Sequence, residues 1–339
     1  MVHTSLVTRE KKTSVLRKGT FGCLAGIPTI NVTQGCMLGC VYCYARGYPG
    51  LPNPETVILF SNLVQRLPGE LSRKRQPVSH VLFNTASDSF QPHPDILNTS
   101  IRLMEILLER SISLSFLTKG VIPHRFFDLV DDSPHHAPLI SARIGMVSLK
   151  EDYQKTFEPH AAAPGVRLRN IERLMEAGIR TEVRIDPVIP FVTDAEEDFD
   201  CLFGELSARG VTRASISVLH LRPAIHAQLE KTLPPVSVRL IETMFRGSAW
   251  RTVGSSTMSK LAPGAVRERI YDRAREIAGE HGVTLTVCAC KNPDIPGELC
   301  TDPIDTGTGL EPTRRQMLLP LGGDDTVPEV DEHQNAISR

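Results

Sequence analysis

The sequence predicts an α/β protein whose parallel strands form an open, partial barrel. Short apolar, β-branched segments alternate with longer amphipathic segments between about residues 26 and 221, as in repeated βα units. Six segments have the character of strands, which is too few to close an eight-stranded barrel but enough for a partial one. In such folds ligands gather at the carboxyl ends of the strands, where loops and helix N-termini converge.

The predicted strands are apolar and β-branched, with polar or turn-forming residues at their ends. In chain order they cover residues 27–33, 78–85, 113–118, 139–148, 181–189 and 213–221. A further strand-like segment, 283–287, lies beyond the alternating region. The predicted barrel therefore contains the first six segments.

The helical segments have recognisable ends. Residues 165–177 carry an apolar stripe, and a helix at about 264–280 follows the barrel region. The helix between them is expected to begin with a capping box formed by Asp194 and Glu197. A glycine that can adopt a left-handed backbone follows each helix. These glycines are Gly178, Gly210 and Gly282.

The composition is that of a globular protein and does not favour a membrane or nucleic-acid partner. Of the 339 residues, 41% are hydrophobic and 23% are charged, and the formal net charge is -1. No stretch approaches the roughly 18 uninterrupted apolar residues of a transmembrane helix. The first residues lack the apolar region of a secretory signal. We therefore expect a cytoplasmic protein, in which eight cysteines need a purpose other than disulfides.

Three of these cysteines lie on one short loop directly after the first strand. Cys36, Cys40 and Cys43 have the spacing C-x3-C-x2-C, and three such thiolates can cap three corners of a cubane iron–sulfur cluster. The fourth iron is then open to a substrate or cofactor. Gly35 and Gly39 allow the backbone to fold tightly around the cluster. Zinc is the alternative, but structural zinc prefers four ligands, and no fourth cysteine or histidine lies nearby in the sequence.

With Tyr42 before its third cysteine, this motif resembles the signature of the radical S-adenosylmethionine (radical SAM) superfamily. Other stretches are similar to the spore-photoproduct-lyase-like branch of that superfamily. They are FNTASDSFQPHPD (83–95), FLTKG (116–120), the strand ending in Ser148, FEPHAAAPGVRLRNIERLMEAGI (157–179) and VRIDPVIP (183–190). The resemblance covers about residues 26–222 and implies a partial (β/α)6 TIM-type barrel.

The resemblance also implies cofactors. A 4Fe-4S cluster on Cys36, Cys40 and Cys43 would bind the amino and carboxylate groups of S-adenosylmethionine. One-electron reduction would then cleave the cofactor to a 5'-deoxyadenosyl radical that abstracts hydrogen from a substrate in the barrel mouth. We expect a flavodoxin or ferredoxin as the electron donor.

Polar residues at the strand ends match family positions around the cofactor. Ser87 and Asp88 match a pair near the cofactor, and Lys119 matches a lysine that reaches the methionine carboxylate. Ser148 matches a serine on the ribose side, and Tyr42 would lie beside the adenine. The resemblance therefore implies that these five residues bind the cofactor.

Charged residues also lie on the fifth predicted strand and after the sixth. Arg184 and Asp186 point to the same face of their strand, and we expect a side chain of this pair to reach the barrel mouth and take part in catalysis. His220 and His226 flank Arg222, where they either line the mouth or make structural hydrogen bonds.

One departure from the lyase-like branch bears on the substrate. The photoproduct lyase has a cysteine just before the Ser-Asp pair that returns a hydrogen atom to the repaired thymine, whereas this sequence has Thr85 and Ala86 there. No thiol is available for that step, and the near-neutral charge gives no independent support for a DNA partner. The sequence therefore argues against DNA repair by the lyase mechanism.

A second group of cysteines follows the last strand-like segment. Cys288, Cys290 and Cys300 have the spacing C-x-C-x9-C and suit an auxiliary 4Fe-4S cluster with three protein ligands. The alternatives are a zinc site completed by His281 or a distant ligand, and buried cysteines without a metal. The other two cysteines have no partner spacing and are expected to pack as small apolar side chains. They are Cys23 and Cys201.

An auxiliary cluster with an open iron is typical of the sulfur-inserting enzymes of the superfamily. The two cysteine groups are similar to those expected of an enzyme that exchanges a nucleoside's ring oxygen for sulfur, as in albomycin-type thionucleoside assembly. We therefore predict an enzyme of natural-product biosynthesis that forms a carbon–sulfur bond on a small, nucleoside-like metabolite. The alternatives are a nucleic-acid repair or modification enzyme and a non-enzymatic zinc protein.

The predicted organisation has four parts. An N-terminal arm (1–25) with solvated basic residues precedes the barrel domain (26–222). A C-terminal region (223–300) carries the auxiliary cluster, and an irregular tail (301–339) rich in proline, glycine and aspartate follows it.

Overall fold

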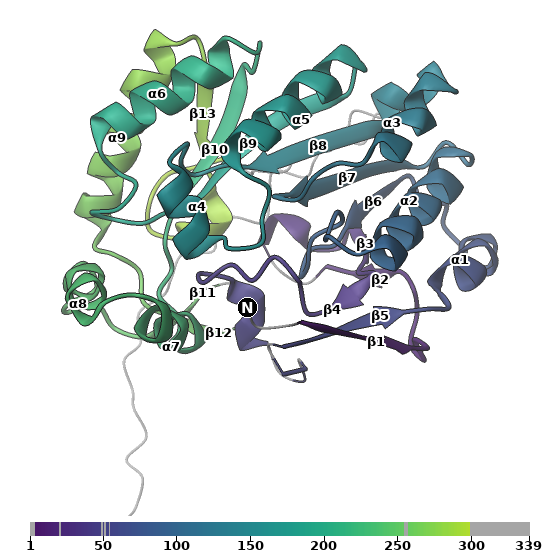
Figure 1. The fold of residues 1–339 in the computed structure, drawn as a ribbon, viewed down its shortest axis with the longest axis horizontal. Helices are drawn as coiled ribbons and strands as arrows, with labels where there is room; N and C mark the ends of the chain where they lie inside the picture. The colour runs from purple at the N-terminus through teal and green to yellow at the C-terminus, as the bar shows by residue number, and fades with distance from the viewer. Residues whose placement is uncertain are drawn as a thin grey trace, which may run out of the picture. The chain divides into compact units, whose positions relative to one another are not determined.

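An eight-stranded sheet lies at the centre of the structure (Figure 1), a computed structural model that describes residues 4–19, 22–48, 50, 52–53, 55–253 and 257–298. Its spatial order is β13-β10-β9-β8-β7-β6-β3-β2. The neighbouring pairs from β3 to β13 are parallel, and β2 is antiparallel to β3. In chain order the strands are β2 (Arg17–Lys18), β3 (Pro28–Ile30), β6 (His80–Phe83), β7 (Ser113–Thr118), β8 (Ile140–Gly145), β9 (Arg180–Val188), β10 (Arg213–Val218) and β13 (Thr284–Val287).

The six predicted barrel strands are confirmed as β3, β6, β7, β8, β9 and β10. The first is shorter than predicted, because the chain leaves the main sheet after Ile30 and pairs elsewhere as β4 (Thr33–Gln34). The segment 283–287 forms β13, which pairs in parallel with β10. The parallel sheet therefore continues past the sixth strand into the C-terminal cysteine segment.

Two small sheets accompany the main one. β4 lies beside β5 (Thr56–Phe60), which pairs in parallel with β1 (Ser5–Arg9). β11 (Arg251–Val253) and β12 (Thr257–Ser259) form an antiparallel pair. Parts of the predicted N-terminal arm are therefore strands, and Lys11 within it is buried.

Helices connect most of the parallel strands. They are α1 (Leu63–Ser72), α2 (Pro94–Leu108), α3 (His124–Asp131), α4 (Glu151–Phe157), α5 (Pro164–Glu176), α6 (Glu196–Ser207), α7 (Pro223–Thr232), α8 (Pro235–Thr243) and α9 (Gly264–Glu280). Short 3-10 helices are η1 (Gly22–Leu24), η2 (Tyr44–Gly47), η3 (Pro134–Leu139) and η4 (Ala289–Lys291). The glycines predicted to end α5, α6 and α9 all have left-handed backbones, with φ between +71° and +76°.

The capping box predicted at the start of α6 is wrong. The N-cap is Ala195, and its side chain makes no capping hydrogen bond. The Asp194 carboxylate instead accepts a hydrogen bond from the Phe191 backbone N–H at 2.7 Å. The Asp194 side chain thus stabilises the turn before the helix. An aspartate carboxylate can accept a hydrogen bond either from the backbone of a turn or from the first N–H groups of a helix, and here it bonds to the turn.

The core lies on both faces of the parallel strands, as expected when helices cover such a sheet. In β7, buried side chains occupy positions on both faces of the strand. Edge-to-face contacts of Phe90, Phe116 and Phe126, with ring centroids 5.2–5.5 Å apart, join this strand to α3 and to the loop before α2. These apolar contacts fix the carboxyl ends of the central strands, where the candidate site lies.

Hydrogen bonds of Tyr271 on α9 join the C-terminal segment to the barrel. Its phenol accepts a hydrogen bond from the Val218 backbone N–H at 3.0 Å and donates one to Asn292 at 2.9 Å. The helix α9 packs beside α6 and over β13 (Figure 1). One buried hydroxyl thus links the end of β10 to the residues that follow the last cysteines described.

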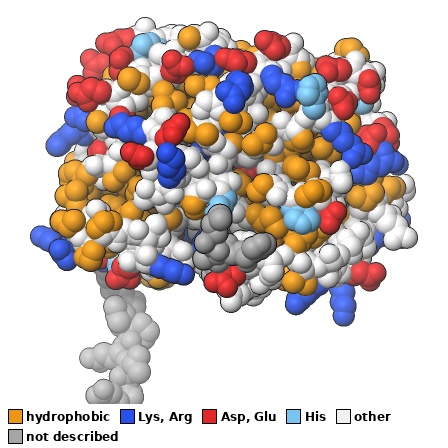
Figure 2. Space-filling model, in the orientation of Figure 1, with side chains coloured by type: hydrophobic (Ala, Val, Ile, Leu, Met, Phe, Trp, Pro, Cys, Tyr) orange, Lys and Arg blue, Asp and Glu red, His pale blue; other side chains and the backbone are white. Residues whose placement is uncertain are grey.

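The surface carries both signs of charge. On the face drawn in Figure 2, acidic and basic side chains are interspersed among the described residues, in keeping with the net charge of -1. Among those residues, no helix combines the length and apolar character needed to cross a membrane.

We predict that Tyr271→Phe lowers the free energy of unfolding by about 1–3 kcal/mol, because it leaves the buried Val218 N–H without its partner and removes one of the hydrogen bonds of the Asn292 side chain. Urea unfolding followed by circular dichroism measures the change. As a control, Thr99→Val removes an exposed hydrogen bond on α2 and should change the free energy by less than about 0.5 kcal/mol. Equal effects of the two substitutions would contradict the linking role.

Candidate functional site

The first cysteine group lies on the loop that follows β3 and β4. Cys36, Cys40 and Cys43 all line one cavity of about 230 Å³. The other residues around it are Gly35, Gly39, Ala45, Arg46, Tyr48, Gly50, Pro52, Asn53, Thr56 and Ala86. The loop therefore turns three thiols toward a shared space next to the ends of the parallel strands.

Two glycines give this loop its shape, as the sequence predicted. Gly35 and Gly39 have φ angles of +88° and +68°, which other residues adopt only with strain. A side chain at Gly39 would also lie 3.2 Å from the His160 ring. The loop is thus pressed against the segment after α4, and the His160 backbone N–H donates to Leu38.

Three cysteines around one cavity suit an iron–sulfur cluster, because each thiolate can cap a different iron. Burial, with the Asp88 charge nearby, raises the pKa of Cys36, and burial, with Glu158 nearby, raises that of Cys40 to about 12. The thiolates therefore need a cationic centre to compensate them.

A buried ion pair holds the cysteine loop from behind. The carboxylate of Glu158 is fully buried, pairs with the buried Arg167 guanidinium and accepts a hydrogen bond from the Tyr42 hydroxyl. Arg167 also donates to the backbone carbonyls of Gly145 at 2.7 Å and Ala162 at 2.8 Å. Tyr42 is therefore an anchor of the loop, and its predicted contact with adenine remains a prediction.

Asp88 organises the ends of β6 and β7. One carboxylate oxygen accepts hydrogen bonds from the Phe90 backbone N–H at 2.8 Å and from the Thr118 hydroxyl at 2.7 Å. The other oxygen accepts from the Lys119 backbone N–H at 2.8 Å. Burial raises the pKa of Asp88, while these hydrogen bonds act in the opposite direction. The Asp88 carboxylate thus makes three hydrogen bonds within the protein, one of which fixes the backbone of Lys119.

Lys119 points toward the cysteine loop. Its ammonium nitrogen lies 5.5 Å from the centre of the Tyr42 ring, and its charge acts to lower the pKa of Cys40. Gly145 makes room for this side chain, because a Cβ there would lie 2.8 Å from the lysine nitrogen. In the described part of the chain, Lys119 has no carboxylate within 4.0 Å. A carboxylate of a bound ligand could therefore pair with it.

The two predicted serines lie beside these groups. Ser148, which is buried after β8, accepts a hydrogen bond from the Lys150 backbone N–H at 3.1 Å. Ser87 lies 3.4 Å from the Asn84 side-chain oxygen. Both are at the carboxyl ends of their strands, and their contacts with a cofactor remain predictions.

Arg184 and Asp186 share one face of β9 and bond to each other. The Arg184 Nε lies 2.9 Å from Asp186 Oδ2, and Lys291 Nζ lies 2.5 Å from the same oxygen. Burial acts to raise the pKa of Asp186, but the charges of Lys291 and Arg184 outweigh it and hold that pKa well below its usual value. Lys291 directly follows Cys290, so Asp186 connects the barrel strand to the second cysteine group.

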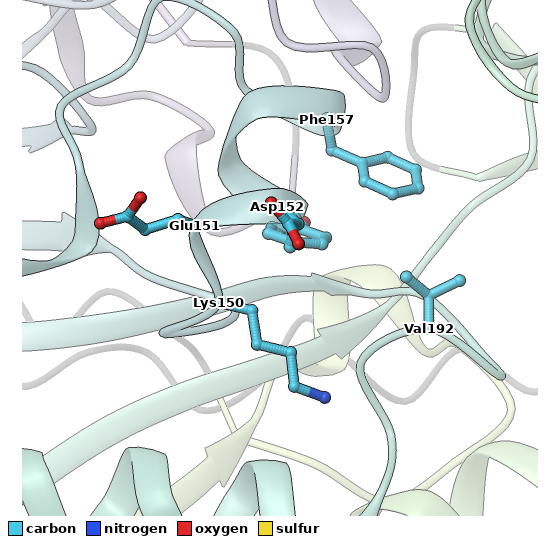
Figure 3. A pocket seen from close by; sticks show the side chains of 6 residues that line it. Lys150, Glu151, Asp152, Phe157 and Val192 are labelled. Carbon is cyan, nitrogen blue, oxygen red and sulfur yellow. The ribbon is translucent and has the colours of Figure 1, made fainter.

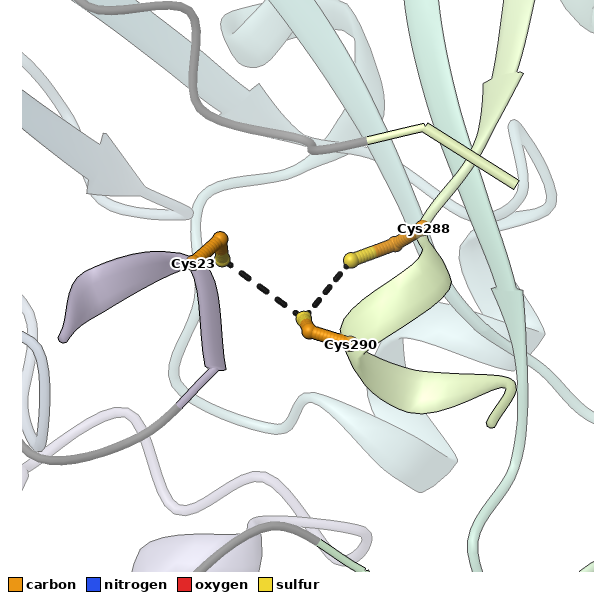
Figure 4. Close-up of side chains that lie close together, drawn as sticks. All are labelled: Cys23, Cys288 and Cys290. Atoms are coloured by element: carbon orange, nitrogen blue, oxygen red, sulfur yellow. Dashed lines mark hydrogen bonds between the residues drawn. The ribbon is translucent and has the colours of Figure 1, made fainter. Parts of the chain in front are cut away.

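The second cysteine group gains a member that the sequence did not predict. Cys23 Sγ lies 3.5 Å from Cys290 Sγ, which lies 2.8 Å from Cys288 Sγ (Figure 4). All three sulfur atoms lie within 4.8 Å of one another, as the ligands of a metal site do. The prediction that Cys23 packs as an isolated thiol is wrong, because η1 brings it against η4 from the other end of the chain.

A local signal for Cys23 was present in the sequence. It stands between Gly22 and Gly26, both of which have left-handed backbones. A Cβ at Gly22 would lie 2.6 Å from the Cys290 Cβ, so glycine is needed for the close approach of the two segments. A cysteine flanked by conformationally special glycines resembles the arrangement around Cys36 and Cys40.

Other histidine and cysteine predictions have mixed outcomes. Cys300 lies outside the described residues. His281 bonds to Asp200 at 2.8 Å and does not belong to the group of close cysteine ligands found among the described residues. Cys201 is exposed, and the prediction that it packs as an apolar side chain is wrong. His226 pairs with Glu242 and Glu230 and has a structural role on α7 and α8.

A second hollow of about 460 Å³ lies between α4 and the loop after β9 (Figure 3). Its lining consists of Lys150, Glu151, Asp152, Tyr153, Phe157 and Val192. It has no cysteine, and its Lys150 is exposed and paired with Asp198. The chemistry of the candidate site therefore lies in the cysteine cavity.

Comparisons with known proteins agree with this geometry. The sequence profile of the radical SAM superfamily matches residues 30–201, just over half of the chain. An uncharacterized protein of Mycobacterium tuberculosis is 28% identical over 201 residues, which are 57% of this chain and 59% of that protein. A "Radical SAM Nalpha-GlyT isomerase" of Pseudomonas phage M6 is 23% identical over 258 residues, 75% of this chain and 51% of the phage protein. The chain thus matches less than two thirds of the length of these relatives.

A solved structure shares the fold. Spore photoproduct lyase complexed with dinucleoside spore photoproduct aligns with a TM-score of 0.66 over 84% of this chain and 82% of that chain. The sequence identity is 17%, so the similarity concerns the fold.

We predict that Glu158→Gln lowers the free energy of unfolding by about 3–5 kcal/mol, because it leaves the buried Arg167 charge without its carboxylate. Urea unfolding measures the change. The exposed pair of Glu151 and Lys155 supplies the control, since Glu151→Gln should cost less than about 1 kcal/mol. A loss for Glu158→Gln no larger than that of the control would show that the pair does not hold the loop.

Proposed function

The chain belongs to the radical SAM superfamily, and from this premise we propose that it is an enzyme that forms a carbon–sulfur bond on a small, nucleoside-like metabolite of natural-product biosynthesis. The single observation that carries the sulfur chemistry is the convergence of Cys23, Cys288 and Cys290 on one point. Asp186 and Lys291 link that point to the barrel mouth.

The first cysteine group fits the catalytic cluster. Cys36, Cys40 and Cys43 would hold a 4Fe-4S cluster, which together with S-adenosylmethionine supplies a 5'-deoxyadenosyl radical for hydrogen abstraction. Lys119 would bind the methionine carboxylate with its ammonium group. The wall of the cavity would exclude water from the reacting groups.

The remaining predicted cofactor residues have supporting roles in this proposal. Asp88 fixes the backbone of Lys119, and Ser87 and Ser148 offer hydroxyl groups at neighbouring strand ends. Tyr42 holds the cysteine loop in place through Glu158. The cofactor would thus bind a surface that is already ordered by buried hydrogen bonds.

The second cysteine group would hold an auxiliary 4Fe-4S cluster. Soft thiolates that are close together suit iron–sulfur or zinc. We favour iron–sulfur because an auxiliary cluster with an open iron is typical of the sulfur-inserting enzymes of the superfamily. Lys291 follows Cys290 directly and bonds to Asp186 on β9, which places this group next to the charged residues of the barrel strand. Arg184 and Asp186 would then orient the substrate between the two cysteine groups. The electron donor would be a flavodoxin or ferredoxin, and the proposed location is the cytoplasm.

A nucleic-acid repair or modification enzyme is a second candidate. The shared fold with a lyase that is bound to a dinucleoside photoproduct favours it. Two features weigh against it: Thr85 and Ala86 stand where the lyase-like branch has its hydrogen-donor cysteine, and the described surface in Figure 2 has no continuous basic field.

The first test of this proposal is iron and sulfide analysis after anaerobic reconstitution. Two clusters give about eight irons per chain, and one gives about four. We expect about eight for the wild type and about four for both Cys23→Ala and Cys288→Ala. Cys201→Ala, at an exposed cysteine, is the matched control and should keep about eight. Four irons with one bound zinc in the wild type would contradict the auxiliary cluster.

A second prediction separates the two cysteine groups by their chemistry. Cys288→Ala should keep the formation of 5'-deoxyadenosine from S-adenosylmethionine but lose sulfur transfer, whereas Cys36→Ala should lose both. The assay supplies dithionite, inorganic sulfide and a panel of nucleosides and nucleotides, and mass spectrometry detects an added sulfur or a sulfur-for-oxygen change. Duplex DNA as the one substrate that is converted would support the repair enzyme instead.

A further inference from the structure

Arg222 is a buried cation whose donors are not all satisfied. It lies directly after the carboxyl end of β10, at the N-cap of α7, and its exposed fraction is 6%. Its Nε and Nη1 atoms are buried and have no hydrogen-bond partner among the described residues. Each buried donor without a partner costs about 1–3 kcal/mol, and an unpaired buried charge costs more. The side chain is therefore prepared for a partner that the described part of the chain does not provide.

The surroundings of Arg222 are aromatic and neutral. The guanidinium carbon lies 5.6 Å from the centre of the Tyr44 ring, and the Tyr48 phenol forms a hydrogen bond with the guanidinium. His220 is close by, and its buried Nε2 atom also lacks a partner within the part of the chain that the structure describes. Burial, together with the charges of Lys291 and Arg222, lowers the pKa of His220 to about 3, so its ring is neutral near pH 7. None of these neighbours offers a negative charge.

The nearby carboxylate is already used. Asp186 binds Lys291 at 2.5 Å and Arg184 at 2.9 Å. In the part of the chain that the structure describes, no carboxylate oxygen lies within 4.0 Å of the Arg222 guanidinium. This corner of the barrel mouth thus has an excess of positive charge, and an oxyanion would satisfy both the charge and the two free donors.

The position of Arg222 relates it to the cysteine cavity. Tyr44 and Tyr48 follow Cys43, and Tyr48 lines the cavity that holds the three thiols. The helix α7 packs on η2 of the same loop, where Arg46 bonds to Gln228 at 3.2 Å. An anion on Arg222 would therefore lie behind the wall formed by Tyr48, beside the first cysteine group.

Two cations at separate strand ends point to two separate anions. Lys119 follows β7 and lies near Cys40, whereas Arg222 follows β10, and β8 and β9 lie between these two strands in the sheet. The proposed function already assigns the methionine carboxylate to Lys119. We propose that Arg222, with His220 beside it, binds an oxyanion of the substrate, a phosphate or a carboxylate. The substrate class is thereby narrowed from a nucleoside-like metabolite to an anionic one.

The test is a binding measurement that does not depend on turnover. Anaerobically reconstituted protein saturated with S-adenosylmethionine is titrated by calorimetry with nucleosides, their 5'-monophosphates and their 5'-carboxylates. We expect the wild type to bind an anionic form more tightly than the matching nucleoside. Arg222→Gln should lower the affinity for the anionic form by about ten- to hundredfold and leave the affinity for the uncharged nucleoside unchanged. Arg222→Lys should lose less, because it keeps the charge but not the forked donors.

The control removes a positive charge from the same helix. Lys231 is exposed in the last turn of α7, and Lys231→Gln should change no affinity. Melting temperature and iron content are measured for each variant, and if Arg222→Gln does not fold, the comparison of Arg222→Lys with the wild type decides the outcome.

Three results would overturn the inference. The first is no preference of the wild type for any anionic probe. The second is an equal loss for charged and uncharged probes in Arg222→Gln. The third is a loss of affinity for S-adenosylmethionine in Arg222→Gln, which would assign Arg222 to the methionine carboxylate. The inference rests on the proposed small-molecule substrate, but failure of the cluster chemistry would be seen in the iron analysis and not in these binding ratios.

Discussion

The arrangement of the first cysteine group depends on one buried carboxylate. Glu158 binds Tyr42 of the cysteine loop and Arg167 of α5, and Arg167 in turn binds the end of β8 through the Gly145 carbonyl. The cysteine loop, the end of β8 and α5 are therefore fixed relative to one another by a single charge pair. Because neither partner is exposed, the pair resists screening by salt, and removal of either charge leaves the other without compensation.

Electrostatic character changes across the barrel mouth. Near the first cysteine group, the charges of Asp88 and Glu158 disfavour free thiolates, which suits ligands that are to be compensated by a cationic metal centre. Toward the second group, Lys291 and Arg222 make the mouth positive. A molecule with an anionic end and a neutral reacting end would thus be oriented before any chemistry begins.

The sequence predicts most of the fold and the first cysteine group, but not the full membership of the second cysteine group. The alternation of strands and helices and the glycines that end helices are local signals, so β6 to β10 and α5, α6 and α9 could be placed. The first cysteine group is also local, since its members lie within eight residues. The glycines beside Cys23 are a local signal, but its cysteine partners, like the role of Arg222, depend on contacts formed in three dimensions. The capping box failed because Asp194 can serve a turn or a helix equally well.

The members of the two cysteine groups come together at different stages of synthesis and folding. Cys23 and Cys290 are 267 positions apart, and all the strands from β3 to β13 are synthesised between them. A nascent chain that has formed its early strands already holds the whole ligand set of the first group, whereas the second group requires the finished sheet. A metal bound by the second group would therefore require the folded protein. A chain that ends before Cys288 could not bind that metal.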